Sequence, residues 1–154
     1  MKEKVDVLVF DLDGTLVDLY GIPNWLEMLR AEDATPYEVA EPLYDMFELA
    51  AVLNALRNKG VTIAVTTWSS MGGSREYNKR VRAAKIAWLE KYNFPVDVFH
   101  CQAYGTTKAN ATRKYGGNQI LIDDNAKVRK GWKLGRTIDA NFDIMGELYN
   151  LLCE

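Results

Sequence analysis

Short apolar runs alternate along the chain with longer segments in which apolar residues recur every three or four positions. The clearest run, Val5 to Phe10, is rich in β-branched residues and ends on an acidic turn. This pattern is typical of a buried strand in a parallel sheet. A second run, Val61 to Val65, follows Gly60 and ends in two threonines. Further strands are predicted at residues 96–100, 119–122 and 136–138.

Helical patterns fill the intervals between these strands. In the longest interval, Leu49, Val52 and Leu56 repeat at helical spacing, and Lys59-Gly60 supplies a stop. The predicted helices cover residues 24–30, 42–58, 74–92, 108–115, 126–134 and 142–152. The alternation of strand and helix predicts an α/β fold, a Rossmann-like parallel sheet with right-handed crossovers and helices on both faces.

The composition narrows the class of protein. A chain of 154 residues is the length of one domain, so residues 1–154 are predicted to form a single unit. With 48% hydrophobic and 26% charged residues it should fold as a globular protein. Its net charge of −2 disfavours a globally basic nucleic-acid binder.

Cysteine and histidine are scarce. Cys101 and Cys153 lie far apart, and His100 is the single histidine, so a disulfide framework and a Cys/His zinc site both lack ligands. The first apolar run is too short for a signal peptide, and no stretch approaches about 18 apolar residues. We therefore expect a cytoplasmic protein with no membrane partner; its oligomeric state stays open.

Polar side chains directly follow three of the predicted strands. In parallel α/β sheets, ligands bind beyond the carboxyl ends of the strands. Four carboxylates meeting there would repel one another unless a cation joins them or a proton is shared. A divalent metal is the simplest resolution, and ligation by oxygen alone favours magnesium, which also takes phosphate oxygens. The side chains are Asp11 and Asp13, Thr66 and Thr67, and Asp123 and Asp124.

Residues 10–16, with the sequence F-D-L-D-G-T-L, resemble the first motif of the haloacid dehalogenase (HAD) superfamily, D-x-D-G-T after an apolar strand. Two acids at this spacing can turn to the same side, so that one attacks a phosphorus atom while the other transfers protons. The resemblance implies that Asp11 is the nucleophile that forms an aspartyl-phosphate and that Asp13 is the general acid. Gly14, grouped with the substrate-binding residues, lets the backbone turn sharply. Taken alone, the pattern also fits a surface turn.

The second and third motifs of that superfamily are less specific. A threonine or serine at the end of the next core strand orients the phosphoryl group, and Thr66 is the first candidate, with Thr67 as the alternate. A lysine near a helix start offsets the negative charge. Lys108 suits that place, and Lys114 is the rival. A threonine at a strand end is more often only a β-former, and a lone lysine is usually a solvated surface charge, so these assignments depend on position in the chain.

Residues 119–125, with the sequence Q-I-L-I-D-D-N, resemble the fourth motif, an apolar strand that ends in paired acids. In the superfamily one of these acids holds magnesium beside the nucleophile. The resemblance therefore implies a magnesium-dependent HAD-like phosphatase, a phosphomonoester hydrolase. Its predicted metal ligands are Asp11, Asp13, Asp123 and Asp124, and the sequence does not rank the last two.

In this superfamily, substrate specificity usually comes from a cap domain inserted between the motifs, and the core elements predicted here leave little of the chain for one. Only residues 16–41 are available for a minimal cap, so the predicted site is open to a small phosphorylated substrate. Trp68 is the candidate to stack on a base or sugar. The run K-I-A-W-L-E-K-Y from Lys85 is similar to the 5′(3′)-deoxyribonucleotidase branch, which favours a nucleotide substrate. Trp88 in this run is expected to face the core.

Two groups of basic residues leave further alternatives open. They are interpreted as solvated helix faces, yet one begins directly after the acid pair. A polynucleotide-end phosphatase is therefore an alternative, as is a phosphatase for protein or sugar phosphates. A non-catalytic metal- or phosphate-binding module is the alternative from another class. The groups are Lys127, Arg129, Lys130, Lys133 and Arg136, and Arg75, Lys79, Arg80, Arg82 and Lys85.

Overall fold

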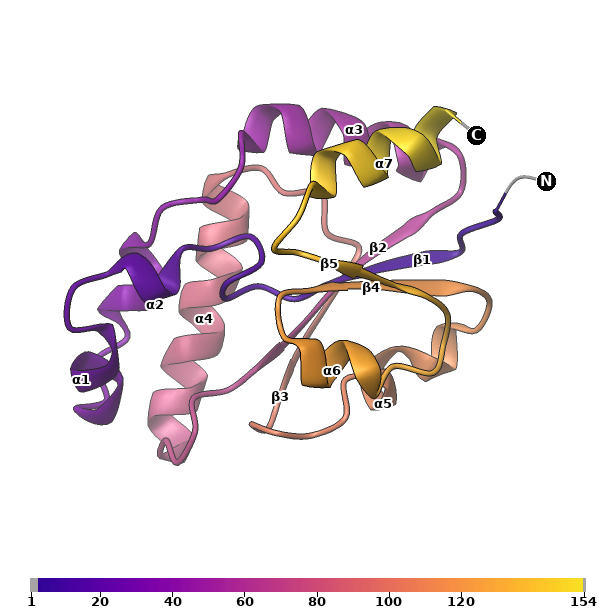
Figure 1. The fold of residues 1–154 in the computed structure, drawn as a ribbon. Coiled ribbons are helices and arrows are strands. Elements are labelled where there is room, and N and C mark those ends of the chain that lie inside the picture. The colour runs from indigo at the N-terminus through magenta and orange to yellow at the C-terminus, as the bar shows by residue number, and fades with distance from the viewer. Residues whose placement is uncertain (1–2, 154) are drawn as a thin grey trace.

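The computed structural model describes residues 3–153 and contains a five-stranded, fully parallel sheet in the order β3-β2-β1-β4-β5 (Figure 1). Each predicted strand is present, within a few residues of its expected bounds. The strands are β1 (Val7–Phe10), β2 (Thr62–Trp68), β3 (Val98–Gln102), β4 (Gln119–Asp123) and β5 (Thr137–Asp139). The predicted α/β fold class is confirmed.

Strand β1 occupies the centre of the sheet, and all four of its side chains are buried. Its neighbours are β2 and β4, in a register that pairs Val7 with both Thr62 and Gln119. The chain runs outward from β1 through β2 to β3 and then returns to β4, so the order reverses beside β1. Ligand sites of open α/β sheets lie at this switch point, which is where Asp11 follows β1.

Helices cover both faces of the sheet, as expected. On one face α3 and α7 pack on Leu8, Phe10 and their neighbours, and on the other Ala109 of α5 and Trp132 pack on Val9 (Figure 1). The helical segments are η1 (Leu19–Gly21), α1 (Trp25–Arg30), α2 (Thr35–Val39), α3 (Met46–Asn58), α4 (Arg75–Lys91), α5 (Ala109–Thr112), η2 (Arg113–Tyr115), α6 (Ala126–Lys130) and α7 (Ile144–Cys153).

Several boundaries differ from the sequence-based expectation for local reasons. Helix α3 begins at Met46 instead of residue 42, because the Asp45 side chain accepts hydrogen bonds from the Phe47 and Glu48 N–H groups and so fixes the start. Helix α6 ends at Lys130 instead of residue 134, with Gly131 at its C-cap. Helix α2 was not predicted at all, since it has only five residues and lies within the presumed lid.

Residues 16–41, predicted as a minimal cap, contain three short helical segments, η1, α1 and α2, and are called the cap below. Figure 1 shows the cap beside α4, away from the main sheet. A separate apolar cluster holds it there, in which Leu19, Ala34 and Tyr37 of the cap pack with Tyr77 and Val81 of α4. Within residues 3–153, no helix combines the length and the apolarity needed to cross a membrane.

Candidate active site

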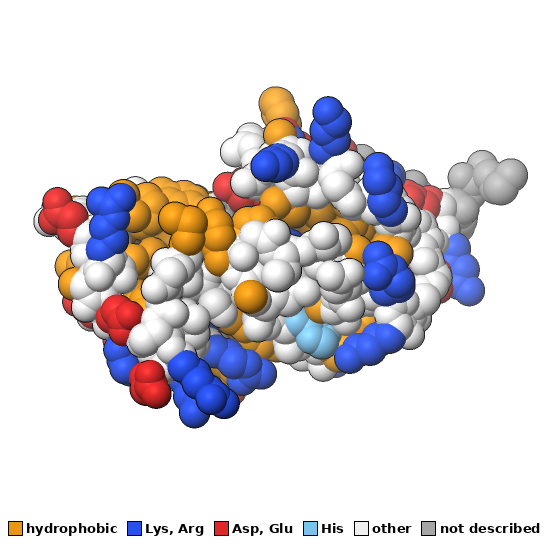
Figure 2. All heavy atoms as spheres, turned by 90° about the horizontal axis from the view of Figure 1, so that it is seen from below, with side chains coloured by type: hydrophobic (Ala, Val, Ile, Leu, Met, Phe, Trp, Pro, Cys, Tyr) orange, Lys and Arg blue, Asp and Glu red, His pale blue; other side chains and the backbone are white. Residues whose placement is uncertain are grey.

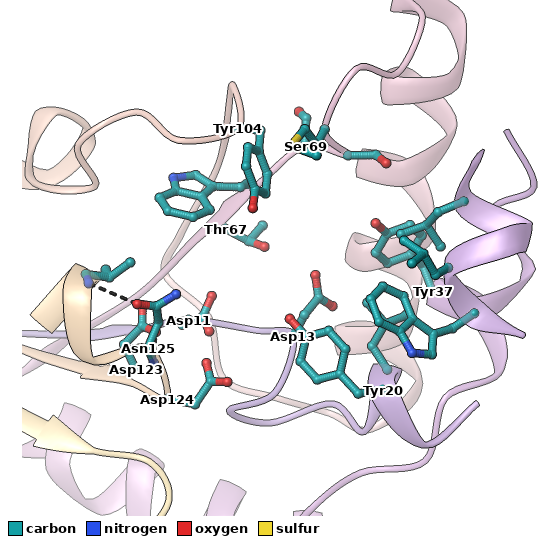
Figure 3. A pocket seen from close by; sticks show the side chains of 18 of the residues that line it. Asp11, Asp13, Tyr20, Tyr37, Thr67, Ser69, Tyr104, Asp123, Asp124 and Asn125 are labelled. Atoms are coloured by element: carbon teal, nitrogen blue, oxygen red, sulfur yellow. Dashed lines mark hydrogen bonds between the residues drawn. The ribbon is translucent and has the colours of Figure 1, made fainter. Parts of the chain in front are cut away.

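Three carboxylates converge beyond the carboxyl ends of β1 and β4 (Figure 3). Asp11, Asp123 and Asp124 each place an oxygen within 4.8 Å of the others. The Lys108 ammonium lies between two of them, at 2.7 Å from Asp11 Oδ1 and 2.8 Å from Asp123 Oδ2. The tertiary structure thus brings residues more than 100 positions apart into one buried cluster, as the order of the strands predicts.

The D-x-D-G-T turn reaches this cluster through Thr15 and Gly14. The Thr15 hydroxyl donates to Asp11 Oδ2 (3.0 Å) and accepts from the Asp124 backbone N–H (3.1 Å), so it joins the two acidic segments. Gly14 has a φ of +81°, and a Cβ there would collide with the Asp124 carboxylate. Its N–H donates to the Val17 carbonyl and is therefore engaged within the turn. Thr15 was missed as a site residue, although it is part of the motif.

Asp13 points away from the carboxylate cluster, toward the cap (Figure 3). Among the described residues it is absent from the group that could hold a metal, which differs from its predicted role as a ligand. Its carboxylate instead accepts a hydrogen bond from Lys85 Nζ at 3.0 Å. The other oxygen, Oδ1, is buried and has no partner within residues 3–153. Asp13 as a residue nevertheless lines the pocket described below.

Lys85 is a second site residue that sequence reasoning missed. It was assigned to a solvated basic face, but its side chain is only 1% exposed. Its ammonium donates to Thr67 Oγ1 (2.8 Å), the Trp68 carbonyl (2.8 Å) and Asp13, which uses all three of its hydrogens. The signal was available in the helical period, because Lys85 shares the buried face of α4 with Val81 and Trp88.

The two threonines of β2 lie on opposite sides of the sheet, because successive side chains of a strand alternate. Thr67 lines the pocket and accepts from Lys85, which leaves its hydroxyl hydrogen free to donate. Thr66, the first candidate from sequence, is fully buried, lies outside the pocket and has a hydroxyl without a partner in the described chain. The alternate, Thr67, therefore occupies the position that the sequence assigned to Thr66.

The two candidate lysines also have different surroundings. Lys108 is 3% exposed at its side chain and contacts the acids, whereas Lys114 is exposed and lies over the Tyr115 ring. Trp88 is buried and donates its indole N–H to the Ala40 carbonyl, as a core residue would.

Burial and repulsion between like charges make the carboxyl groups of Asp13, Asp123 and Asp124 resist ionisation. Burial, with the charge of Asp11, raises the pKa of Asp124 to about 7 and also raises the pKa of Asp123. Burial raises the pKa of Asp13 as well, although Lys85 opposes this. Burial disfavours the charge on Lys108, but Asp11 and Asp123 outweigh it, so the pKa of Lys108 is raised. Lys108 therefore stays charged beside the two acids.

The cluster suits a magnesium ion. Asp11, Asp123 and Asp124 offer only oxygen donors, which magnesium prefers, and a divalent cation would relieve the repulsion that raises the pKa values of Asp123 and Asp124. Asp123, which ends β4, and Asp124, which follows it, are not equivalent. Both oxygens of Asp123 are engaged, by Lys108 and by the Asn125 N–H, whereas the Asp124 carboxyl group lies against that of Asp11 and has one long contact, 3.4 Å, with the Thr15 hydroxyl.

A pocket of about 310 Å³ opens from the acids toward the cap. Asp11, Asp123 and Asp124 lie at one end, the end beside the cap is apolar, and Asp13 lies between the two (Figure 3). Trp68 belongs to the wall beside the acids: its ring centroid is 5.2 Å from Lys108 Nζ and 5.1 Å from the ring of Tyr104, and its indole N–H donates to the Thr106 carbonyl (2.9 Å). The apolar and aromatic lining consists of Leu19, Tyr20, Trp25, Leu26, Leu29, Tyr37, Trp68, Met71, Tyr104 and Val128.

No protein-family model and no curated protein matches this sequence. Solved structures do match its fold. The D,D-heptose 1,7-bisphosphate phosphatase of B. bronchiseptica, complexed with magnesium and phosphate, superposes with a TM-score of 0.58 at 11% identity, covering 97% of this chain and 99% of that one. The same enzyme from Burkholderia thailandensis gives 0.57 at 10%, with coverage of 97% and 99%.

A third structure, a protein of Mesorhizobium loti assigned as a HAD-like phosphatase, gives a TM-score of 0.58 at 14% identity, covering 99% of this chain and 87% of that one. These similarities extend over nearly the whole chain. The protein therefore has the fold of HAD-like phosphatases, as the resemblance of its motifs implied.

Proposed function

We propose that the protein is a magnesium-dependent phosphomonoester hydrolase that acts through an aspartyl-phosphate on Asp11. The observation that carries the proposal is the convergence of Asp11, Asp123 and Asp124 around Lys108 at the switch point of the sheet. The shared fold supports it, because two of the similar structures are phosphatases of a sugar bisphosphate.

The two acids of the first motif take different parts in the reaction. An oxygen of Asp11 attacks phosphorus as the bond to the leaving oxygen breaks, and Asp13 gives that oxygen a proton. Asp13 then takes a proton from the water that attacks the aspartyl-phosphate, which releases phosphate and restores Asp11. The raised pKa of Asp13 supports its role as a proton donor, and its carboxylate faces the end of the pocket where the leaving group would lie.

Three further side chains position the reactants. Lys108 offsets the charge of Asp11 and of the incoming phosphoryl group, and one of its three hydrogens is free of the acids. The Thr67 hydroxyl donates to a phosphoryl oxygen. Lys85 holds Thr67 and Asp13 in place but has no free hydrogen for the substrate, so it is a positioning residue.

Asp11 and Asp124 would hold the magnesium ion, with Asp123 holding Lys108 beside them. Bound there, the ion would neutralise charge on the phosphoryl oxygens. This assignment follows from the hydrogen bonds of the two aspartates, because both oxygens of Asp123 are engaged by Lys108 and Asn125, whereas Asp124 makes one long hydrogen bond to Thr15.

The aromatic lining of the pocket favours an ester with a flat aromatic group, such as a nucleoside monophosphate. Tyr20 and Tyr37 on the cap side, and Trp68 and Tyr104 beside the acids, offer ring faces and edges for a base. On the face shown in Figure 2, Lys and Arg side chains form separate groups with apolar and uncharged surface between them. That arrangement suits a small substrate better than a polynucleotide strand.

The test is phosphate release from p-nitrophenyl phosphate and from a panel of nucleoside monophosphates, sugar phosphates and 5′- or 3′-phosphorylated oligonucleotides. We expect turnover with magnesium, none with EDTA, and none for Asp11→Asn in a folded sample. A higher kcat/KM on oligonucleotides, falling steeply with salt, would favour the polynucleotide-end alternative. Binding of magnesium without turnover of any ester would favour the non-catalytic module.

A further inference from the structure

The turn that joins α1 to α2 is fastened to the start of α4 by Glu32. Its Oε1 accepts a hydrogen bond from the Ser74 hydroxyl (2.5 Å) and its Oε2 accepts one from the Ser74 backbone N–H (3.0 Å). Ser74 is the N-cap of α4, and its hydroxyl oxygen accepts from the Tyr77 N–H (3.1 Å). Glu32 therefore places its charge at the amino-terminal end of a helix of 17 residues, where negative charge is stabilised.

Two side chains of α4 hold the backbone of the same turn. Arg80 Nη2 donates to the Glu32 carbonyl (3.1 Å), and the buried Tyr77 hydroxyl donates to the Asp33 carbonyl (3.1 Å). Glu32 itself adopts a left-handed conformation with a φ of +57°, which turns the chain sharply between the two cap helices. The Ser74 hydrogen bonds also lower the pKa of the Glu32 carboxyl, so this group is ionised at neutral pH.

This contact connects two rims of the pocket. On one rim the cap contributes Trp25, Leu29 and Tyr37, and on the other the loop between β2 and α4 contributes Ser70 and Met71. That loop leads directly into Ser74. Glu32 lines no part of the pocket, yet its hydrogen bonds fix the cap relative to the loop.

We infer that Glu32 is a specificity-determining positioning residue: the Glu32–Ser74 clasp sets the width of the apolar end of the pocket and so selects the leaving group. The inference rests on the proposed phosphatase function. Glu32 acts through the cap, because it contacts neither the acids nor the pocket. Its loss widens or loosens the leaving-group end while the phosphoryl end, built on the sheet, keeps its geometry.

Two aryl esters of similar leaving-group chemistry but different size, phenyl phosphate and 2-naphthyl phosphate, test this. For Glu32→Ala we expect KM for 2-naphthyl phosphate to rise about tenfold with kcat unchanged, as loss of uniform binding predicts. KM for phenyl phosphate and inhibition by inorganic phosphate should change little. Ser74→Gly should act in the same direction, because glycine is tolerated at an N-cap but lacks the hydroxyl.

Glu38→Ala is the matched control, since Glu38 is an exposed acid on α2 and belongs to the same cap. It should leave both esters unaffected. Equal losses on both esters and on phosphate inhibition in Glu32→Ala would overturn the inference in favour of a general structural role. If Glu32→Ala changed neither the kinetic constants for the two esters nor the inhibition by phosphate, the inference would be overturned as well.

A readout without turnover separates this inference from the proposed function. Hydrogen–deuterium exchange over residues 25–39 should increase in Glu32→Ala and not in Glu38→Ala. If the wild-type protein hydrolyses no ester, the proposed function fails while the clasp is still judged by exchange. Exchange that is unaltered by Glu32→Ala would show that no clasp holds the cap.

Discussion

Lys85 and Asp13 form a buried ion pair, with 3.0 Å between Nζ and Oδ2, that ties the middle of helix α4 to the turn after β1. The pair is 72 residues apart in sequence and contacts the proposed phosphoryl site from the cap side. It is the means by which a helix outside the sheet can fix the orientation of the proposed general acid. The pair also lies near the face of Tyr37, whose ring centroid is 4.9 Å from Nζ, so the cap contributes to its surroundings.

Replacing Lys85 by methionine should reduce both turnover and stability. Asp13 and Thr67 would lose the group that orients them, and a partly buried carboxylate would be left without its cation, which costs about 3 kcal/mol when one partner of a buried pair is removed. Chemical denaturation and steady-state kinetics measure the two effects. Lys79→Met is the control, because Lys79 is exposed on the same helix. Normal kcat in a folded Lys85→Met sample would contradict the positioning role.

Replacing Asp13 by asparagine should slow proton transfer by a factor of about 10² to 10⁴. The loss in the first half-reaction should be smaller for esters with acidic leaving groups, because these depart without a proton. A series of aryl and alkyl phosphates, followed by rapid quench, measures this dependence. An equal loss for formation of the intermediate from aryl and alkyl esters would mean that Asp13 is not the acid.

Magnesium should support activity, and EDTA should abolish it. We expect Asp124→Asn to raise the magnesium concentration required more than Asp123→Asn does, because both oxygens of Asp123 are already hydrogen-bonded. Asp123→Asn should instead lower kcat, since Lys108 loses one of its two anionic partners. Titration of activity with magnesium for each variant makes the comparison. If neither variant changes the metal requirement, the proposed ligand set is wrong.

The two adjacent threonines of β2 should respond in opposite ways to valine. Thr67→Val should lower kcat/KM and weaken inhibition by inorganic phosphate, because the pocket loses a hydroxyl donor. Thr66→Val should leave activity unchanged and stabilise the fold by about 1 kcal/mol, since it removes a buried hydroxyl without a partner. Each variant is assayed by kinetics and by thermal unfolding. A kinetic defect confined to Thr66→Val would restore the original assignment.

The fold class and the convergence of the two acidic segments can be predicted from the sequence alone. The spacing of apolar residues predicts where strands and helices lie. Because parallel strands end at the same edge of the sheet, the polar residues that follow β1 and β4 lie together at that edge. Asp11, Asp123 and Asp124 therefore converge as expected. Lys108 lies at the end of the loop that joins β3 to α5. Because this loop is short, it keeps Lys108 at the same edge of the sheet as the acids.

The roles of Thr67 and Lys85 and the presence of α2 could not be predicted in this way. They depend on the direction in which a side chain faces or on contacts between distant segments, which are seen only in the folded structure. One residue of register separates Thr66 from Thr67, and the strand places them on opposite faces. Lysine is usually exposed, but the packing of α4 against the cap and β2 buries Lys85 beside Asp13. Helix α2 is too short to be stable alone, so it forms only because Ala34 and Tyr37 pack against Tyr77 and Val81.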